Sequence, residues 1–156
     1  MRGRWLIVLL ALAAAAAFAL SVQSGRWWSL AGDTSIGPFG SKACFEGQCR
    51  DVVIDGTDRW LRTGIATGAS GLLSMFILTI VAAGVASKRV PKLAAKSALA
   101  SVVTSLTTGA LFMTQRPSIH GIESERGLFL FAIAIGLGIA TTIIVLAAKP
   151  VPSTTT

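Results

Sequence analysis

The two cysteines of this chain, Cys44 and Cys49, are the residues whose type and spacing come nearest to chemistry. Between them, Glu46-Gly47 favours a tight hairpin turn, because glycine readily supplies the positive φ that such turns need. In that hairpin the cysteines face each other as a non-hydrogen-bonded pair, with Cα atoms about 4.5–5.5 Å apart. We therefore expect a structural disulfide, formed in an oxidising compartment.

A redox-active pair is the alternative for these cysteines. Membrane thiol oxidases also use four helices, but their cysteines have the C-x-x-C spacing, and they need a second pair to relay electrons. Here four residues separate the only two cysteines of the chain. We prefer the structural staple and keep a thiol-redox membrane enzyme as a minor alternative.

The single histidine, His120, is the other candidate for chemistry, together with Glu123 and Glu125. Structural metal sites usually have four well-placed ligands, so an exposed loop histidine is the preferred interpretation. The sequence has no nucleophile–histidine–acid arrangement, phosphate-binding glycine loop or paired carboxylates in a pocket-like setting. We expect no catalytic residue, no metal and no cofactor, and therefore no enzyme.

Four apolar stretches dominate the chain, and each approaches the length of about 20 residues that a helix needs to cross a bilayer. The 156 residues are 53% hydrophobic and 13% charged, with a mean hydropathy of +0.70. This predicts an all-α integral membrane protein, a single four-helix transmembrane bundle. No charged residue lies in the centre of a stretch, which argues against a proton relay or ion-coupled transporter. The predicted helices are Trp5–Val22, Thr63–Ser87, Leu93–Thr114 and Gly127–Ala148.

The net charge is +7, and the basic and acidic residues are distributed as a membrane topology would predict. Seven basic residues lie at the N-terminus, between the second and third stretches and after the fourth, whereas all seven acids lie in the other connections. The positive-inside rule places both termini in the cytoplasm, in a plasma membrane or bacterial inner membrane. Residues 23–60 and 115–126 then lie outside, and 150–156 form a disordered tail. The partners this implies include membrane lipid, with anionic headgroups near the basic side, and exclude nucleic acid.

The first stretch also resembles a secretory signal peptide. It has a basic start, an apolar core and an A-x-A pattern that ends at Ala19. The apolar run continues to Val22, so we prefer a retained helix and keep cleavage after Ala19 as the alternative.

The long outer loop has the pattern of short strands separated by glycine and proline. Residues 26–31, 35–39, 42–45 and 51–55 predict a small antiparallel sheet of three or four strands, stapled by the disulfide. Three tryptophans flank this loop: Trp27, Trp28 and Trp60. They fit an interfacial aromatic belt, the core of the sheet, or both.

This arrangement resembles the claudin and peripheral myelin protein superfamily of four-transmembrane proteins. Trp28 matches the first tryptophan of that family's W…G-L-W-x-x-C…C signature, and Cys44 and Cys49 match the cysteine pair. Phe39 stands where the family has its second tryptophan, and Arg62 matches an arginine near the start of the second helix. The alanine-rich helices and the absence of asparagine suggest a bacterial relative. The resemblance implies self-association through Trp27, Trp28 and the 37–49 strands.

Small residues recur at helical spacing in three of the four stretches, where they permit close helix approach in lipid. We expect these seams to pack the bundle, or in part to recruit the helix of a partner. The seams contain Gly64 and Gly68; Ser97, Ser101, Ser105 and Gly109; and Gly136, with Ala132 and Ala140 beside it.

Together these features predict a non-enzymatic structural or interaction protein of the membrane. It would bind copies of itself or other membrane proteins through its outer loop and small-residue helix faces. An accessory subunit of a larger respiratory, secretion or motility complex is the main alternative.

Overall fold

The computed structural model describes residues 2–30, 33–53, 57–88, 92–115 and 121–148, and not the side chains of residues 2 and 57–59. His120 and the tail 150–156 lie outside this part of the chain. Its four helices are all long and apolar enough to cross a membrane, as an integral membrane protein requires. They are α1 (Arg2–Ser24), α2 (Thr57–Ala86), α3 (Lys92–Thr114) and α4 (Arg126–Ala147).

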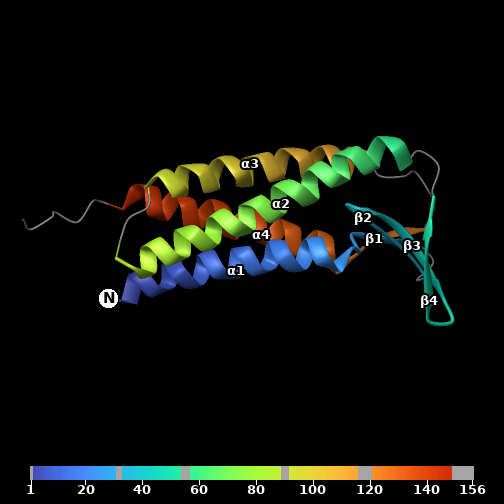
Figure 1. The fold of residues 1–156 in the computed structure, drawn as a ribbon, viewed down its shortest axis with the longest axis horizontal. Coiled ribbons are helices and arrows are strands. Elements are labelled where there is room, and N and C mark those ends of the chain that lie inside the picture. Colours follow the sequence, from blue (N-terminus) through green and yellow to red (C-terminus); the bar gives the residue numbers. More distant parts are fainter. Residues whose placement is uncertain (1, 31–32, 54–56, 89–91, 116–120, 149–156) are drawn as a thin grey trace, which may run out of the picture.

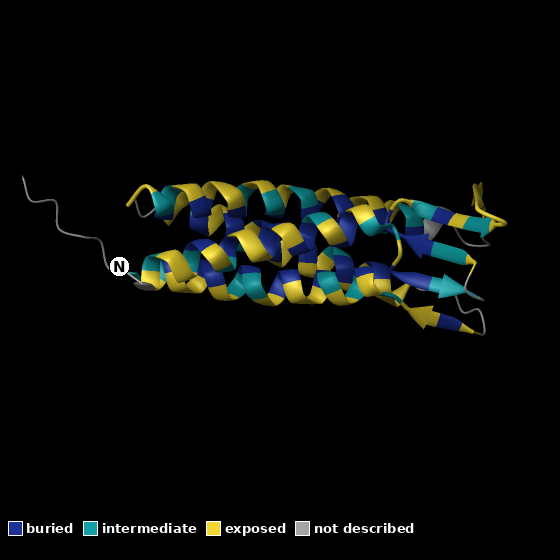
Figure 2. Ribbon diagram, turned by 90° about the horizontal axis from the view of Figure 1, so that it is seen from below, coloured by how far each residue is buried: buried dark blue, intermediate teal, exposed yellow. Residues whose placement is uncertain are grey.

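The helices form an up-and-down bundle in which each packs against two others. Helix α1 packs on α2 and α4, and α3 packs on the same two helices from the other side. The start of α1 and the end of α4 therefore lie at the same end of the bundle (Figure 1). Buried residues line the inner faces of the helices and exposed ones the outer faces, as Figure 2 shows.

A five-stranded antiparallel sheet lies at the opposite end of the bundle (Figure 1), in the order β4-β3-β2-β1-β5. The predicted strands are present with shifted bounds, and the sheet has one strand more than we expected. The additional strand, β5, comes from the short second loop and pairs Ser124 with Trp28. The strands are β1 (Trp28–Leu30), β2 (Thr34–Gly37), β3 (Gly40–Phe45), β4 (Gln48–Val52) and β5 (Ile122–Ser124).

Backbone hydrogen bonds join the end of α1, the sheet and the start of α4. Trp27 donates its N–H to the carbonyl oxygen of Ile36 at 2.9 Å, and its own carbonyl accepts the N–H of Glu125 at 2.9 Å. The Ser21 hydroxyl of α1 donates to the carbonyl of Gly127 in α4 at 2.8 Å. The sheet is therefore anchored to the bundle at the point where the chain leaves α1.

Helix α1 runs without interruption through Ala19, the last residue of the possible signal peptide. Phe18, Ser21 and Val22 on both sides of that point are buried in the bundle. Cleavage after Ala19 stays an untested alternative, but the segment has the packing of a bundle helix.

Candidate functional site

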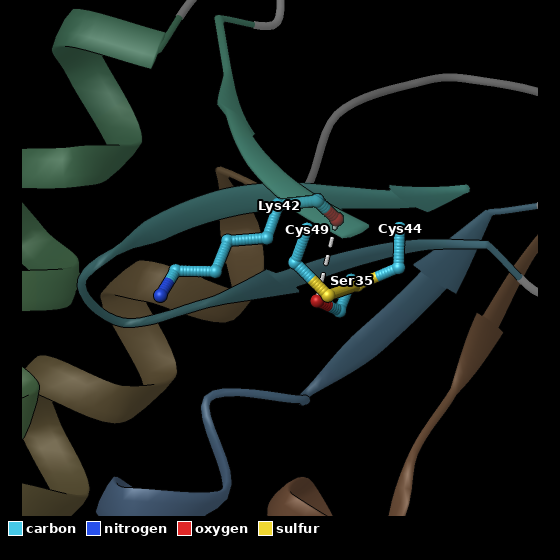
Figure 3. The surroundings of a disulfide bond; sticks show 4 residues. All are labelled: Ser35, Lys42, Cys44 and Cys49. Atoms are coloured by element: carbon cyan, nitrogen blue, oxygen red, sulfur yellow. Dashed lines mark hydrogen bonds between the residues drawn. A yellow bond between two sulfur atoms is a disulfide. The ribbon is translucent and has the colours of Figure 1, made fainter. Parts of the chain in front are cut away.

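The hairpin of β3 and β4 carries the predicted disulfide between Cys44 and Cys49 (Figure 3). The register pairs the two cysteines directly, next to the Phe45–Gln48 pair that closes the turn. Glu46 and Gly47 have φ values of 47° and 81°, so both turn residues are left-handed, as a two-residue hairpin requires. The Cα atoms are 4.0 Å apart, closer than we expected. The disulfide prediction is confirmed.

Within the described ranges, no group of three His, Cys, Asp or Glu residues is placed to hold a metal ion. Glu123 is exposed in β5, and Glu125 precedes α4 at its N-cap position. His120 is outside the described residues, so the weak metal site considered for it stays untested.

Six aromatic rings fill the junction between the sheet and the bundle. Trp27 lies at its centre, with its ring 4.7 Å from that of Phe131 and 5.5 Å from that of Phe112. Its indole N–H donates to the carbonyl of Ser21 at 3.1 Å. The rings come from α1, the loop, α2, α3 and α4, so the cluster ties together all four helices and the sheet. Its members are Phe18, Trp27, Trp28, Trp60, Phe112 and Phe131.

The three tryptophans predicted as interaction residues are interior to the fold. Trp27, Trp28 and Trp60 are only 0%, 1% and 2% exposed. The tryptophans therefore fit a packed core and not an interfacial aromatic belt, because a belt would leave the rings open to lipid headgroups. They present no surface to a partner in this conformation, so we do not propose them as contact residues. Phe112 of α3 and Phe131 of α4 complete the cluster. Their positions in the sequence did not predict that they would pack against the tryptophans.

The two glycines of the α2 seam both lie against the β2–β3 turn, and Gly64 also makes room for the Phe112 ring of α3, 3.0 Å from an added Cβ atom. A side chain at Gly64 would collide with the carbonyl of Pro38, and one at Gly68 would collide with the ring of Phe39. Phe39 is exposed on its other side. Pro38 and Phe39 therefore dock the β2–β3 turn onto α2. At Gly68 the turn takes the place of the expected helix, whereas Gly64 lies against both the turn and Phe112 of α3. Arg62, two residues before Gly64 on α2, is exposed.

The α3 seam packs against α2 through buried hydroxyl groups. Ser74 of α2 lies 3.2 Å from the hydroxyl of Ser101 and 3.1 Å from that of Ser105. A turn further along, Ser70 bonds Thr108 at 3.1 Å. Four of these hydroxyls also bond a carbonyl of their own helix, so the contacts between the helices add to bonds already made within each helix. We call Ser70, Ser74, Ser101, Ser105 and Thr108 the hydroxyl ladder.

Gly109 extends the same face of α3 with a different partner. A Cβ atom there would lie 2.5 Å from the Phe131 ring, so Gly109 makes room for an aromatic side chain of α4. Ser97 is exposed, which corrects its assignment to this seam.

Helix α4 also departs from the predicted packing. Gly136 is exposed with nothing within 4 Å of an added Cβ atom, and Ala132 and Ala140 beside it are exposed too. Helix α4 instead packs through Gly138, where a Cβ atom would lie 3.0 Å from Val102. The expectation that Gly136 packs the bundle is wrong. We call Ala132, Gly136 and Ala140 the outward stripe.

Comparison of the chain with models of known protein families gave no match, and comparison with curated proteins gave none either.

Proposed function

We propose that this chain is a non-enzymatic membrane protein that binds other membrane proteins through helix α4. The observation that carries the proposal is the outward stripe: three small residues, four apart, exposed on a helix that is apolar enough to cross a membrane. The bundle does not use them, because α4 meets its neighbours through other residues.

A stripe of this kind suits a helical partner better than lipid. Small side chains allow two helix backbones to approach closely and to gain van der Waals contact along their length. Gly136 has open space around its Cα atom, so a partner's helix meets no obstacle there. Phe129 and Ile133 flank the stripe and are exposed, which provides larger side chains to pack around the close contact.

The partner is a second copy of this chain or a different subunit of a larger complex. The four helices, the sheet in the first loop and the stapled cysteine pair support a distant relationship to the claudin superfamily. We propose that relationship on the order of the elements and on Trp28, Cys44 and Cys49. It favours the self-associating form of the function over the accessory-subunit form.

Mild-detergent extraction from native membranes, followed by native mass spectrometry, tests the proposal. We expect the wild-type chain to be recovered in a defined complex, and Gly136→Ile to release it as a monomer. Ala16→Ile places the same side chain at an exposed position of α1 and should leave the complex intact. A wild-type monomer, or equal behaviour of the two variants, would contradict the proposal. A complex of this chain alone would mean self-association, and a foreign protein in fixed ratio would mean an accessory role.

A further inference from the structure

A cavity of about 740 Å³ lies between the sheet and the ends of α1 and α2, on the side of the disulfide hairpin. Its size is in the range of small-molecule and cofactor sites. Its walls belong to three parts of the fold: the end of α1 with the segment after it, the β2–β4 strands, and α2. No part of the proposed protein-binding role uses this cavity, which is separate from the outward stripe on α4.

The wall of the cavity on the bundle side is apolar. Val22 of α1 and Leu61 and Leu72 of α2 contribute to it, with Phe39 from the β2–β3 turn. Leu72 lies three turns along α2 from Leu61, inside the span that is apolar enough to cross a membrane. The cavity therefore reaches from the sheet to the depth at which lipid chains would contact the helices.

The wall on the sheet side carries two cations. Lys42 of β3 and Arg26, just after α1, both line the cavity and are both exposed. Figure 3 shows the Lys42 side chain extended away from the disulfide on the same side of the hairpin. Neither cation forms an ion pair within the described part of the chain. Asp51 faces Lys42 across the β3–β4 ladder and is the one carboxylate among the lining residues, so the lining carries a net charge of +1. Three further carboxylates line the adjacent pocket, which shares Arg26 with this cavity: Asp33, Glu46 and Glu125.

We propose that this cavity binds one phospholipid with an anionic headgroup, in the leaflet on the sheet side. The phosphate would lie between Arg26 and Lys42, since guanidinium and ammonium groups are the usual partners of phosphate oxygens. An acyl chain would follow Val22, Leu61 and Leu72 toward the membrane interior. A soluble anion would use only the cationic half of the cavity, so the apolar wall is what favours a lipid.

The site would also link lipid composition to the stability of the outer sheet. Lys42 lies on the disulfide hairpin, whereas Arg26 lies at the end of α1. A headgroup held by both would join the hairpin to the end of the bundle.

Thermal unfolding of the purified full chain in mild detergent, titrated with phosphatidylglycerol, tests the proposal. Phosphatidylcholine with the same acyl chains and glycerol phosphate without chains serve as the comparison probes. We expect phosphatidylglycerol to raise the unfolding temperature and the other two to have little effect. Equal stabilisation by phosphatidylcholine would overturn the headgroup assignment, and equal stabilisation by glycerol phosphate would show a site for a free anion.

Matched variants locate the site. The double variant Arg26→Gln with Lys42→Gln should weaken phosphatidylglycerol binding by about tenfold or more, because it removes both cations beside the anionic headgroup. Arg50→Gln removes a cation from the other face of the same hairpin and should bind as the wild type does. Asp51→Asn removes the one carboxylate and should strengthen binding, a gain that misfolding cannot imitate. Equal weakening by Arg50→Gln, or no gain with Asp51→Asn, would overturn the proposal.

Discussion

At the scale of single residues, glycine and cysteine determine the geometry at the sheet end. Both turn residues of the β3–β4 hairpin have positive φ, which Gly47 adopts easily and Glu46 less so. The sequence was sufficient to predict this hairpin, its register and its disulfide, because a two-residue turn fixes which residues face each other. The sequence did not show what fills the space beside Gly64 and Gly68, because the docking residues come from a distant loop.

We predict that the disulfide stabilises the protein and takes no part in redox turnover. Replacing both Cys44 and Cys49 with serine should lower the free energy of unfolding by about 2 kcal/mol, the chain-entropy value for so short a loop. Thermal unfolding in detergent measures the effect. A reductant should lower the wild-type transition to that of the double variant and leave the variant unchanged. A wild-type transition insensitive to complete reduction would contradict the stabilising role.

Two glycines provide a matched pair that tests the packing of α3 and α4. Gly109→Ala places a methyl group against the Phe131 ring, where an added Cβ lies 2.5 Å from the nearest ring carbon. We expect this overpacking to lower the free energy of unfolding by about 1–3 kcal/mol. Gly136→Ala adds the same group in open space and should leave the free energy of unfolding of the isolated chain unchanged or raise it by up to about 1 kcal/mol, because alanine favours a helix over glycine. Equal effects of the two substitutions would show that α4 is rotated from the orientation described.

At the scale of elements, helices are the part of the fold that the sequence shows best. The lengths of the apolar stretches were enough to predict all four helices. Most of the predicted helix ends lie within a few residues of the observed ones. Helix α2 begins six residues before the predicted Thr63, because its first turns are polar and lie outside the apolar run. The strand β5 was missed because three residues carry no pattern of their own, and Ile122–Ser124 becomes a strand by pairing with β1.

The orientation of helix faces was less predictable. Small residues at four-residue spacing occur both on the buried face of α3 and on the exposed face of α4. Ser101 and Ser105 face α2, while Gly136 faces outward. Spacing identifies a face that can pack closely, but it does not say whether the neighbouring helix belongs to the same chain.

The hydroxyl ladder predicts a local weak point between α2 and α3. Ser74→Ala removes the group that contacts both Ser101 and Ser105, and we expect a loss of about 0.6–2 kcal/mol in the free energy of unfolding. Ser87→Ala, just after α2, is the control, because the Ser87 hydroxyl is exposed and among the described residues bonds the carbonyl of Ala83 alone. Thermal or denaturant unfolding in detergent compares them. No difference between the two variants would mean that the ladder adds nothing to helix association.

At the scale of the whole molecule, charge is separated along the bundle axis. The described acids lie at the sheet end, whereas Lys88, Lys92 and Lys96 lie around the α2–α3 connection at the other end. With the positive-inside rule, this predicts that the sheet faces the outside of the membrane and that both termini face the cytoplasm.

Labelling of introduced cysteines with a membrane-impermeant maleimide tests this orientation. Val53→Cys lies just after β4 and is highly exposed, so we expect it to react in intact cells or right-side-out vesicles. Ser87→Cys lies exposed at the end of α2 and should react only after permeabilisation. The reverse order of reactivity would invert the topology.

The interior of the bundle is packed by residues of the chain itself. The outer face of α4, in contrast, contacts no other described element. The aromatic cluster and the hydroxyl ladder pack the interior, in which the indole nitrogen of Trp60 and the hydroxyl of Thr141 are buried without a hydrogen-bond partner among the described residues. The outward stripe of α4 has no neighbour within the described part of the chain. The proposed function requires that a protein, and not lipid alone, covers that stripe in the membrane.

Photo-cross-linking in native membranes tests most directly whether a protein covers the outward stripe. A diazirine analogue of leucine in place of Ile133 preserves the size of a side chain that flanks the stripe, and the same analogue in place of Leu73 on α2 is the control. The two positions are equally exposed, each at 53%. We predict a defined protein cross-link from position 133 and lipid adducts alone from position 73. Lipid adducts alone from both positions would contradict the proposal that α4 binds a partner protein.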